Sequence, residues 1–382
     1  MSQPSSLPRL AIVLSRPTPE HDSWFRWLHA AGALSFRVFY LIEPHESRAR
    51  PPGEPIAYSP KGYDWEWIEN RARNPSELRF FGLRNPTLRA RIEDWGAQAI
   101  LVFDYAQLTH VQLILWARRR GLPVIFASHS RLSSDAKVPQ RLLRAWILRH
   151  VSACLTDNDY KRTQLLAQGI PSERIFAAPR PIHREHFDPT LPVHQTIALA
   201  LRVELGLAAD TRVMLYHGPL TRESRVGQLL EVFIDLARTD AALVICGEGP
   251  EKPELLARAA RASDTLQLQF LPAPQYTEIP SRYLFADVVV LTASSAHAER
   301  TARNVAHLGR PLLVSDDIRI DFATVSTVWC FRAGDSDDLQ KQLLHAIDNA
   351  RSVSISPTPD THARAAESLF AALRAATGKS KD

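Results

Sequence analysis

The chain contains little cysteine and no long apolar run. Three cysteines (Cys154, Cys246 and Cys330) lie far apart among 382 residues. This odd, scattered set predicts free thiols and excludes a disulfide framework or a CxxC zinc or redox site. No apolar run approaches the roughly 20 residues that a membrane-spanning helix needs. We therefore expect that the chain is not an integral membrane protein. The first ten residues lack the basic and apolar regions of a secretory signal, which predicts a cytoplasmic chain.

Charge is moderate in amount and uneven in distribution. The chain is 45% hydrophobic and 23% charged, which is typical of a soluble globular protein and excludes general disorder. Residues 1–188 hold 26 Lys and Arg against 18 Asp and Glu, a net of +8, which leaves −3 for the remainder. A basic first half suits a phosphorylated small molecule, an anionic membrane or a nucleic acid. An ordinary solvent-exposed surface explains the positive charge of the first half equally well.

Short apolar runs alternate with helical patterns along the whole chain. The predicted strands are 9–14, 36–42, 99–103, 123–127, 153–156, 175–178, 213–217, 242–246, 266–270, 286–291 and 311–315. The predicted helices are 23–31, 85–95, 107–120, 138–150, 159–168, 226–238 and 251–262. This alternation predicts an α/β protein with parallel sheets.

The chain length predicts two domains. The proline-rich segment 179–195 is predicted to be a linker. We therefore expect a first domain over 1–188, a second over 196–360, and a C-terminal helix and tail over 361–382 that crosses back to the first domain.

Two glycine-containing loops follow predicted strands in the second half. Gly247, Glu248 and Gly249 stand between a buried strand and a helix, and Gly218 follows the strand that ends at His217. Glycine allows a ligand to approach the backbone closely, and a free helix N-terminus favours an anion. Neither loop carries a dinucleotide or Walker fingerprint, so a tight structural turn remains an equal alternative for the 247–249 loop.

Two arginines follow Gly218 in the segment His-Gly-Pro-Leu-Thr-Arg-Glu-Ser-Arg. Arg222 and Arg225 are candidates to neutralise a diphosphate through charge-assisted hydrogen bonds. The alternative is a surface loop with solvated arginines.

The order of these segments resembles a known family. Segments 218–220, 230–233, 243–250, 268–272, 283–291 and 309–315 are similar to the donor half of GT-B glycosyltransferases, above all the large retaining family four that uses nucleotide sugars. Segment 331–339 resembles the family's closing segment, and 124–130, 153–159 and 175–182 resemble its acceptor half. The resemblance spans about residues 8–350. It implies two Rossmann-like α/β domains that face each other across a cleft.

The resemblance also implies a set of site residues, from which this sequence departs in part. The family's two donor-site glutamates fall on Ala296 and Asn304, and its diphosphate-binding Arg and Lys fall on Pro219 and Ser224. The family's glycine pair after the first strand is replaced by Ser-Arg-Pro-Thr-Pro at 15–19. His129 stands where the family's acceptor-side histidine usually lies.

Three explanations of these departures stay open. Glu299 takes over the work of the missing carboxylate, while Asn304 binds ribose or sugar hydroxyls and Arg222 or Arg225 binds the phosphates. Alternatively, the donor site has decayed and the chain is a scaffold or partner subunit of another enzyme. A third explanation is that the alignment over 292–304 is shifted.

The predicted site therefore has a catalytic set and a donor-binding set. The catalytic candidates are His129, Arg222, Arg225 and Glu299. The donor-binding candidates are Gly218, Gly247, Glu248, Gly249, Ser294, Ser295 and Asn304. By resemblance, no metal and no cofactor besides the nucleotide sugar is needed.

The resemblance implies transfer of a sugar from a nucleotide donor to a saccharide or lipid-linked acceptor, with retention, in surface polysaccharide or glycoconjugate synthesis. The basic first domain also allows peripheral contact with the inner face of a membrane. A nucleic-acid base glycosyltransferase is a further alternative, although no nucleic-acid-binding module is recognised.

The acceptor side carries two aromatic and basic segments. We interpret 62–73 as an amphipathic helix, with a sugar-stacking or lipid-adjacent surface over 62–73 and 79–84 as the alternative. The basic helix predicted over 138–150 suits an anionic membrane, but packing of its apolar stripe onto the sheet is the interpretation that we favour.

Overall fold

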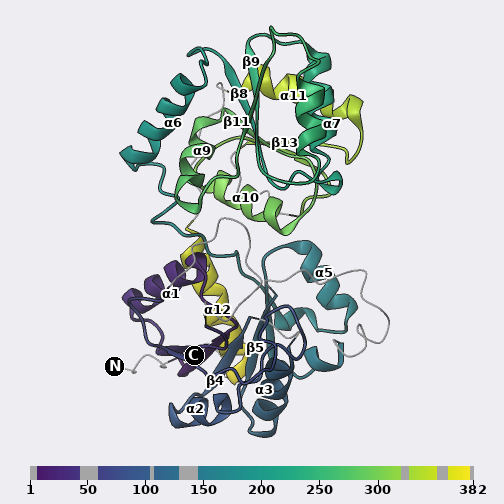
Figure 1. Cartoon of the computed structure of the whole chain (residues 1–382). Coiled ribbons are helices and arrows are strands. Elements are labelled where there is room, and N and C mark those ends of the chain that lie inside the picture. The colour runs from purple at the N-terminus through teal and green to yellow at the C-terminus, as the bar shows by residue number, and fades with distance from the viewer. Residues whose placement is uncertain are drawn as a thin grey trace. The chain divides into compact units, whose positions relative to one another are not determined.

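The computed structural model describes residues 7–43, 59–103, 107–128, 145–319, 327–350 and 360–378, and it divides the chain into two compact units (Figure 1). Unit 1 comprises Met1–His183 with Asp360–Asp382, and unit 2 comprises Arg184–Pro359. The division falls inside the segment predicted to be a linker, five residues before the predicted end of the first domain. Both units are α/β, as the alternating pattern predicts.

Unit 1 is built on a parallel sheet of seven strands in the order β3-β2-β1-β4-β5-β6-β7. The strands are β1 (Leu10–Leu14), β2 (Phe36–Tyr40), β3 (Trp65–Trp67), β4 (Ala99–Val102), β5 (Val124–Ser128), β6 (Ala153–Thr156) and β7 (Ile175–Ala177). Its helices are α1 (Pro19–Ala31), α2 (Leu88–Asp94), α3 (Leu108–Arg119), α5 (Asp159–Ala167) and α12 (Thr361–Thr377), with a 3₁₀ turn at Ser172–Arg174. The fully apolar runs at β1 and β4 are buried on both faces, as expected for a parallel sheet.

Strand β3 corrects the helix predicted over 62–73. Trp65 and Trp67 pair in parallel register with Val38 and Tyr40 of β2. The Trp67 ring lies 5.2 Å from the Tyr40 ring and 5.7 Å from the Trp65 ring. Two aromatic residues separated by one position fit the period of a strand, where cross-strand aromatic contacts stabilise the sheet. The helix predicted over 138–150 lies largely outside the described residues.

Unit 2 is built on a parallel sheet of six strands in the order β10-β9-β8-β11-β12-β13. The strands are β8 (Arg212–His217), β9 (Ala241–Cys246), β10 (Gln267–Leu271), β11 (Val288–Leu291), β12 (Leu312–Ser315) and β13 (Val328–Phe331). The helices are α6 (Pro192–Glu204), α7 (Val226–Leu236), α8 (Lys252–Ala259), α9 (Ile279–Phe285), α10 (Ala296–His307) and α11 (Ser336–Asn349), with 3₁₀ turns at Arg222–Ser224 and Tyr276–Glu278. Helix α6 begins inside the segment predicted to be a linker. Pro192 occupies its first turn, where proline is well tolerated, so this proline is compatible with a helix.

Each sheet has one point where the strand order reverses. In unit 1 the chain adds β2 and β3 on one side of β1 and then continues with β4 on the other side. In unit 2 it adds β9 and β10 on one side of β8 and then continues with β11 on the other side. Open parallel sheets bind ligands in the crevice at this switch point, beyond the carboxyl ends of the strands. The loops after β1 and β4, and those after β8 and β11, are therefore the places to examine.

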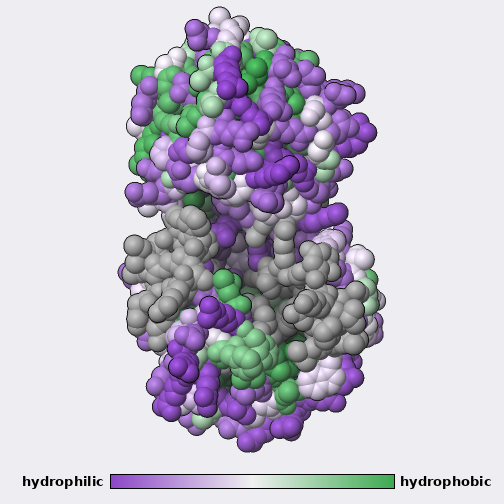
Figure 2. Space-filling view, turned by 45° about the vertical axis from the view of Figure 1, so that its right-hand side comes forward, coloured by the Kyte–Doolittle hydropathy of each residue, from purple (hydrophilic) through white to green (hydrophobic). Residues whose placement is uncertain are grey.

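The described surface mixes hydrophilic and hydrophobic side chains (Figure 2). Among the described helices, none combines the length and the apolar character that crossing a bilayer requires.

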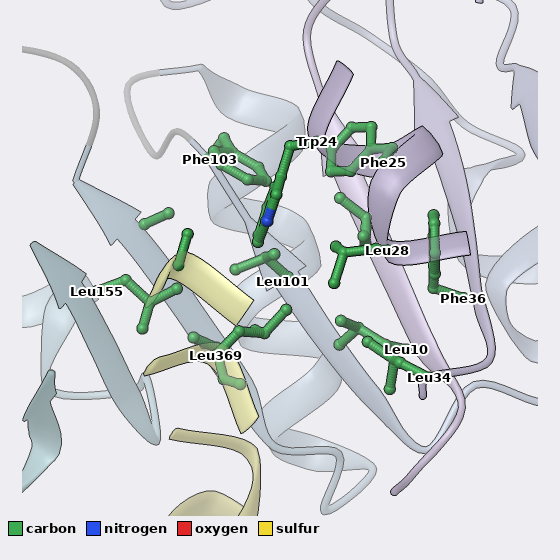
Figure 3. Close-up of a cluster of buried hydrophobic side chains, with 14 of the residues drawn as sticks. Leu10, Trp24, Phe25, Leu28, Leu34, Phe36, Leu101, Phe103, Leu155 and Leu369 are labelled. Atoms are coloured by element: carbon green, nitrogen blue, oxygen red, sulfur yellow. The ribbon is translucent and has the colours of Figure 1, made fainter. Parts of the chain in front are cut away.

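Helix α12 completes the core of unit 1, although it lies at the other end of the sequence. Leu369 and Leu373 are fully buried in the cluster that contains Leu10, Leu101 and Leu155 (Figure 3). The helix is also fixed by hydrogen bonds. The indole Nε1 of Trp24 donates to the main-chain oxygen of His362 (3.3 Å), and the His362 ring Nε2 donates to the Ile182 oxygen (2.9 Å).

Candidate active site

A cavity of about 90 Å³ lies at the switch point of unit 2. It is lined by residues from the end of β8 and the turn that follows, and by residues from the end of β11 to the first turn of α10. The lining residues are Tyr216, His217, Gly218, Pro219, Thr221, Glu223, Ser224, Leu291, Thr292, Ala293, Ser294, Ser295, His297 and Ala298. Small-molecule sites usually measure roughly 300–1,000 Å³, so this cavity suits a phosphate-sized group rather than a whole nucleotide.

The cavity is rich in hydroxyl groups and is closed by the start of α10. The hydroxyl residues that line it are Thr221, Ser224, Thr292, Ser294 and Ser295. Ser295 is the N-cap of α10, and its Oγ accepts a hydrogen bond from the Ala298 N–H at 2.9 Å. The other N–H groups of the first turn have no partner within the helix. Hydroxyls and a helix N-terminus together favour an anion.

Two histidines line the same cavity. His217 ends β8 and His297 lies in the first turn of α10, with ring centroids 4.8 Å apart in an edge-to-face arrangement. The His297 Nε2 donates to the His217 main-chain oxygen at 3.1 Å. The His217 Nδ1 lies 2.8 Å from the Tyr283 hydroxyl, which lies 3.2 Å from the Thr301 hydroxyl. This chain of hydrogen bonds ties β8, α9 and α10 together behind the cavity.

Burial makes both rings neutral at pH 7. It lowers the pKa of His217 to about 3, with smaller contributions from His297 and Arg282. Burial also lowers the pKa of His297, and the nearby Arg300 adds to this effect. Without a ligand, these rings are therefore polar hydrogen-bonding groups rather than cations.

The predicted glycines have different roles. Gly218 lines the cavity, where a Cβ would lie 2.9 Å from the Tyr216 hydroxyl and 3.6 Å from the His297 ring. A Cβ on Gly247 would lie 2.0 Å from the Gly218 oxygen, and one on Gly249 would lie 2.2 Å from the Leu220 oxygen. Gly247 and Gly249 are thus required for close packing of the loops after β8 and β9. This explains them without a ligand.

Hydrogen bonds join these two loops. The Leu220 N–H donates to the Glu248 oxygen at 2.9 Å, and the Glu251 N–H donates to the Leu220 oxygen at 3.0 Å. The Glu248 carboxylate is exposed and pairs with Lys252 at 2.8 Å. The main chain of Glu248 therefore shapes the loop, while its side chain forms a surface ion pair.

Arg222 and Arg225 do not line the cavity at the switch point. They line a second cavity of about 250 Å³ together with Glu251, Glu254 and Arg258. Residues of the turn after Gly218 thus divide between the two cavities: Thr221, Glu223 and Ser224 face one, and Arg222 and Arg225 face the other. None of the described residues that line the switch-point cavity is Lys or Arg.

Arg225 has a structural partner. It adopts a left-handed conformation with φ of 53°. Its guanidinium forms an ion pair with Asp317, in the loop after β12, and lies 3.4 Å from the hydroxyl of Ser315, which ends β12. This arrangement fixes the turn between β8 and α7 and directs the arginine toward β12.

The remaining predicted residues lie just before α10, on α10 or outside the described residues. Ser294 lines the cavity beside Ser295. Glu299 and Asn304 are buried farther along α10, where neither is among the residues that line the cavity. His129 lies outside the described residues. The structure therefore brings Gly218, Ser294 and Ser295 together, and adds His217 and His297.

Unit 1 has polar groups at its own switch point. The Ser15 Oγ after β1 and the Gln107 Oε1 at the start of α3 are buried, and each has no hydrogen-bond partner in the part of the chain that is described. The Gln107 amide nitrogen donates to the Glu77 main-chain oxygen, and the Arg16 guanidinium pairs with the Glu77 carboxylate at 3.2 Å. Across the described residues of both units, no cluster of three metal-ligating side chains occurs.

Two family models match most of the chain. The model "Glycosyl transferases group 1" matches residues 199–352, and "Glycosyl transferase 4-like domain" matches residues 22–181. The two matches correspond closely to the two units of the structure.

Known proteins resemble the chain over different lengths. The alpha-monoglucosyldiacylglycerol synthase of Acholeplasma laidlawii is 23% identical over 184 residues, which cover 45% of this chain and 46% of that protein. The match thus spans about half of that relative.

Solved structures show the same fold over nearly the whole chain. The catalytic domain of starch synthase IV from Arabidopsis thaliana, bound to ADP and acarbose, has a TM-score of 0.68 at 11% identity, covering 98% of this chain and 100% of that one. HepE of Anabaena, in complex with UDP and glucose, has a TM-score of 0.60 at 14% identity, covering 97% and 95%.

Proposed function

Because the chain belongs to the group 1 glycosyltransferases of the GT-B fold, we propose that it transfers a sugar from a nucleotide donor to a saccharide or lipid-linked acceptor. We further propose that transfer proceeds with retention, without a metal ion, in the synthesis of surface polysaccharide or glycoconjugate. The relatives support this range of acceptors. One is named as a synthase of a glucosyl lipid, and another as a glycosyltransferase involved in lipopolysaccharide biosynthesis.

The donor diphosphate is proposed to bind in the switch-point cavity of unit 2. The observation that carries this proposal is the cavity's lining of hydroxyl groups and the first turn of α10. The positions that the family resemblance assigns to a diphosphate-binding Arg and Lys, Pro219 and Ser224, line this same cavity. The site thus keeps the family's place for the diphosphate while it lacks the usual cations.

The chemistry requires that negative charge on the leaving nucleoside diphosphate be stabilised as the glycosidic bond breaks. Here the N–H groups of the first turn of α10 donate to the phosphate oxygens, and the hydroxyl of Ser295 adds a further donor. His297 lies beside them, and an adjacent phosphate would raise the pKa of its ring toward the charged form. Glu299, buried within the same helix, is the carboxylate proposed to take over the work of the family's missing glutamate.

A binding experiment with two variants tests the donor site. The melting temperature of the protein is measured with UDP, GDP, ADP, CMP and dTDP, each titrated to millimolar concentration. We expect one of the nucleotides to raise the melting temperature, since a ligand of the folded state stabilises it by mass action. His297→Ala should weaken that binding at least about tenfold, because a hydrogen bond to a charged group is worth about 1.5–3 kcal/mol.

Arg222→Ala is the matched control, because Arg222 is exposed and lines the other cavity. It should leave the affinity within about twofold. Loss of binding in Arg222→Ala but not in His297→Ala would place the diphosphate in the cavity beside Arg222 instead. No response to any nucleotide would contradict the proposed donor.

A further inference from the structure

The loop from Ser76 to Gly82 in unit 1, here called the Phe80 loop, is held in one conformation by its own backbone. The Ser76 N–H donates to the Gly82 oxygen at 3.1 Å, and the Gly82 N–H donates to the Arg79 oxygen at 2.9 Å. A Cβ on Gly82 would lie 1.9 Å from the Ser76 oxygen, so only glycine permits this closure. The loop is also tied to the body of the unit, because the Leu108 N–H at the start of α3 donates to the Phe80 oxygen at 2.8 Å.

This fixed loop carries large apolar side chains into solvent. Leu78 is 78% exposed, Phe81 is 73% exposed and Phe80 is 39% exposed. The two phenylalanine rings pack edge to face, with centroids 4.9 Å apart. Single exposed apolar residues are ordinary, whereas a contiguous group on a preformed loop marks an interaction surface. Figure 2 shows that the surface of unit 1, the lower unit in that view, carries hydrophobic residues among hydrophilic ones.

Four arginines in the loop or near it in sequence are exposed and unpaired among the described residues. Arg73, Arg79, Arg84 and Arg89 are exposed, and within the described residues none of their side chains forms an ion pair or hydrogen bond. The nearby carboxylate of Glu77 is already paired with Arg16. Anionic groups on a partner would therefore find free guanidinium groups here.

We propose that the Phe80 loop docks unit 1 onto a membrane that contains anionic lipids. Leu78, Phe80 and Phe81 would enter the boundary between head groups and acyl chains, while the surrounding arginines would bind lipid phosphates. Exposed apolar side chains beside unpaired guanidinium groups match the two layers of an anionic lipid surface, the acyl boundary and the phosphates. Docking on a membrane requires neither a nucleotide-sugar donor nor catalysis, so it goes beyond the proposed function. It would place the enzyme where a lipid-linked acceptor lies.

The test is co-sedimentation of the full chain with vesicles. One set is made of phosphatidylcholine alone, and the other of phosphatidylcholine with 30% phosphatidylglycerol, a composition chosen to supply negative charge. We expect binding to the anionic vesicles that falls with rising salt, since surface charges are screened. Leu78→Ser with Phe81→Ser should weaken this binding about tenfold or more, because two large apolar side chains no longer enter the lipid. Arg79→Gln with Arg84→Gln should weaken it roughly fivefold or more on anionic vesicles only.

The matched control is Leu199→Ser with Val203→Ser, two exposed apolar residues of α6 in unit 2. This variant should bind the anionic vesicles like the parent protein. All variants are checked for an unchanged melting temperature and an unchanged nucleotide response, so that a failure of the donor site is recognised separately. Absence of vesicle binding, or binding that the Phe80 loop variants leave intact, would overturn the proposal.

Discussion

At the scale of single residues, His110 combines full burial with two ring nitrogens that have no hydrogen-bond partner among the described residues. Burial lowers the pKa of this ring from 6.5 to about 3, so it is neutral at pH 7. The unfolded chain takes up a proton as the pH falls through about 6.5, while the folded chain does not until about pH 3. His110 therefore reduces the free energy of unfolding by about 1.4 kcal/mol for each pH unit below 6.5.

His110→Leu is predicted to stabilise unit 1. Removal of two unpaired buried polar atoms should raise the free energy of unfolding by about 1–3 kcal/mol at pH 7. On acidification from pH 6.5 to pH 5, the free energy of unfolding of the parent protein falls by about 2 kcal/mol because of His110. The His110→Leu variant should not show this part of the fall. Urea unfolding followed by tryptophan fluorescence measures this, because seven of the eight tryptophans, all but Trp329, belong to unit 1.

The exposed His29 supplies the control. His29→Leu should leave the stability at pH 7 nearly unchanged. A less stable His110→Leu at both pH values would show that the ring of His110 makes an interaction that its surroundings do not reveal.

Residue roles were predictable from sequence only where they follow from position along a strand. Gly218 and Ser295 follow buried strands, and that placement alone predicts the edge of the sheet where they lie. The orientation of Arg225 toward β12 depends on Asp317, which lies 92 positions away in sequence. The contact of His217 with Tyr283 spans 66 positions. No local spacing encodes such pairs, so His297 was not among the predicted residues.

At the scale of elements, buried strands were predictable and short or exposed elements were not. Strand β1 is a continuous apolar run whose burial on both faces leaves a clear signal. Strand β3 has only three residues at the edge of its sheet, too few for its Trp-Glu-Trp alternation to stand out as a strand signal. Helix α6 keeps Val193, Leu199 and Val203 exposed, so its pattern lacks the usual polar outer face.

Helix α12 provides the element-scale prediction. Leu369 is fully buried among core residues that come from β1, β4 and β6. Leu369→Ala should lower the free energy of unfolding by about 2–5 kcal/mol through lost burial and a new cavity. Tryptophan fluorescence during urea unfolding measures this fall in the free energy of unfolding. Leu166→Ala on α5, where the side chain is 42% exposed, should change stability by less than about 1 kcal/mol. Equal effects of the two substitutions would mean that α12 does not contribute to the core of unit 1.

At the scale of the whole molecule, each unit contains its own buried thiol. Cys154 lies on β6 of unit 1 and Cys246 ends β9 of unit 2. Burial raises the pKa of each thiol to about 12, so both stay protonated and unreactive in the folded chain. Cys330 is exposed and reacts in the folded state, which makes it an internal check on the reagent. Thiol labelling read by mass spectrometry therefore follows the unfolding of the two units separately.

The nucleotide found in the binding screen is predicted to protect Cys246 selectively. The switch-point cavity is lined by residues of unit 2 alone, and ligand at 100 times its dissociation constant stabilises the folded state by about 2.7 kcal/mol. For a unit of this size, the midpoint of Cys246 labelling should rise by roughly 5–10 °C, with the midpoint of Cys154 unchanged. An equal rise at both thiols would show that the units unfold as one cooperative body. A rise at Cys154 alone would place the nucleotide in unit 1, because only a site in the protected unit can delay exposure of its thiol.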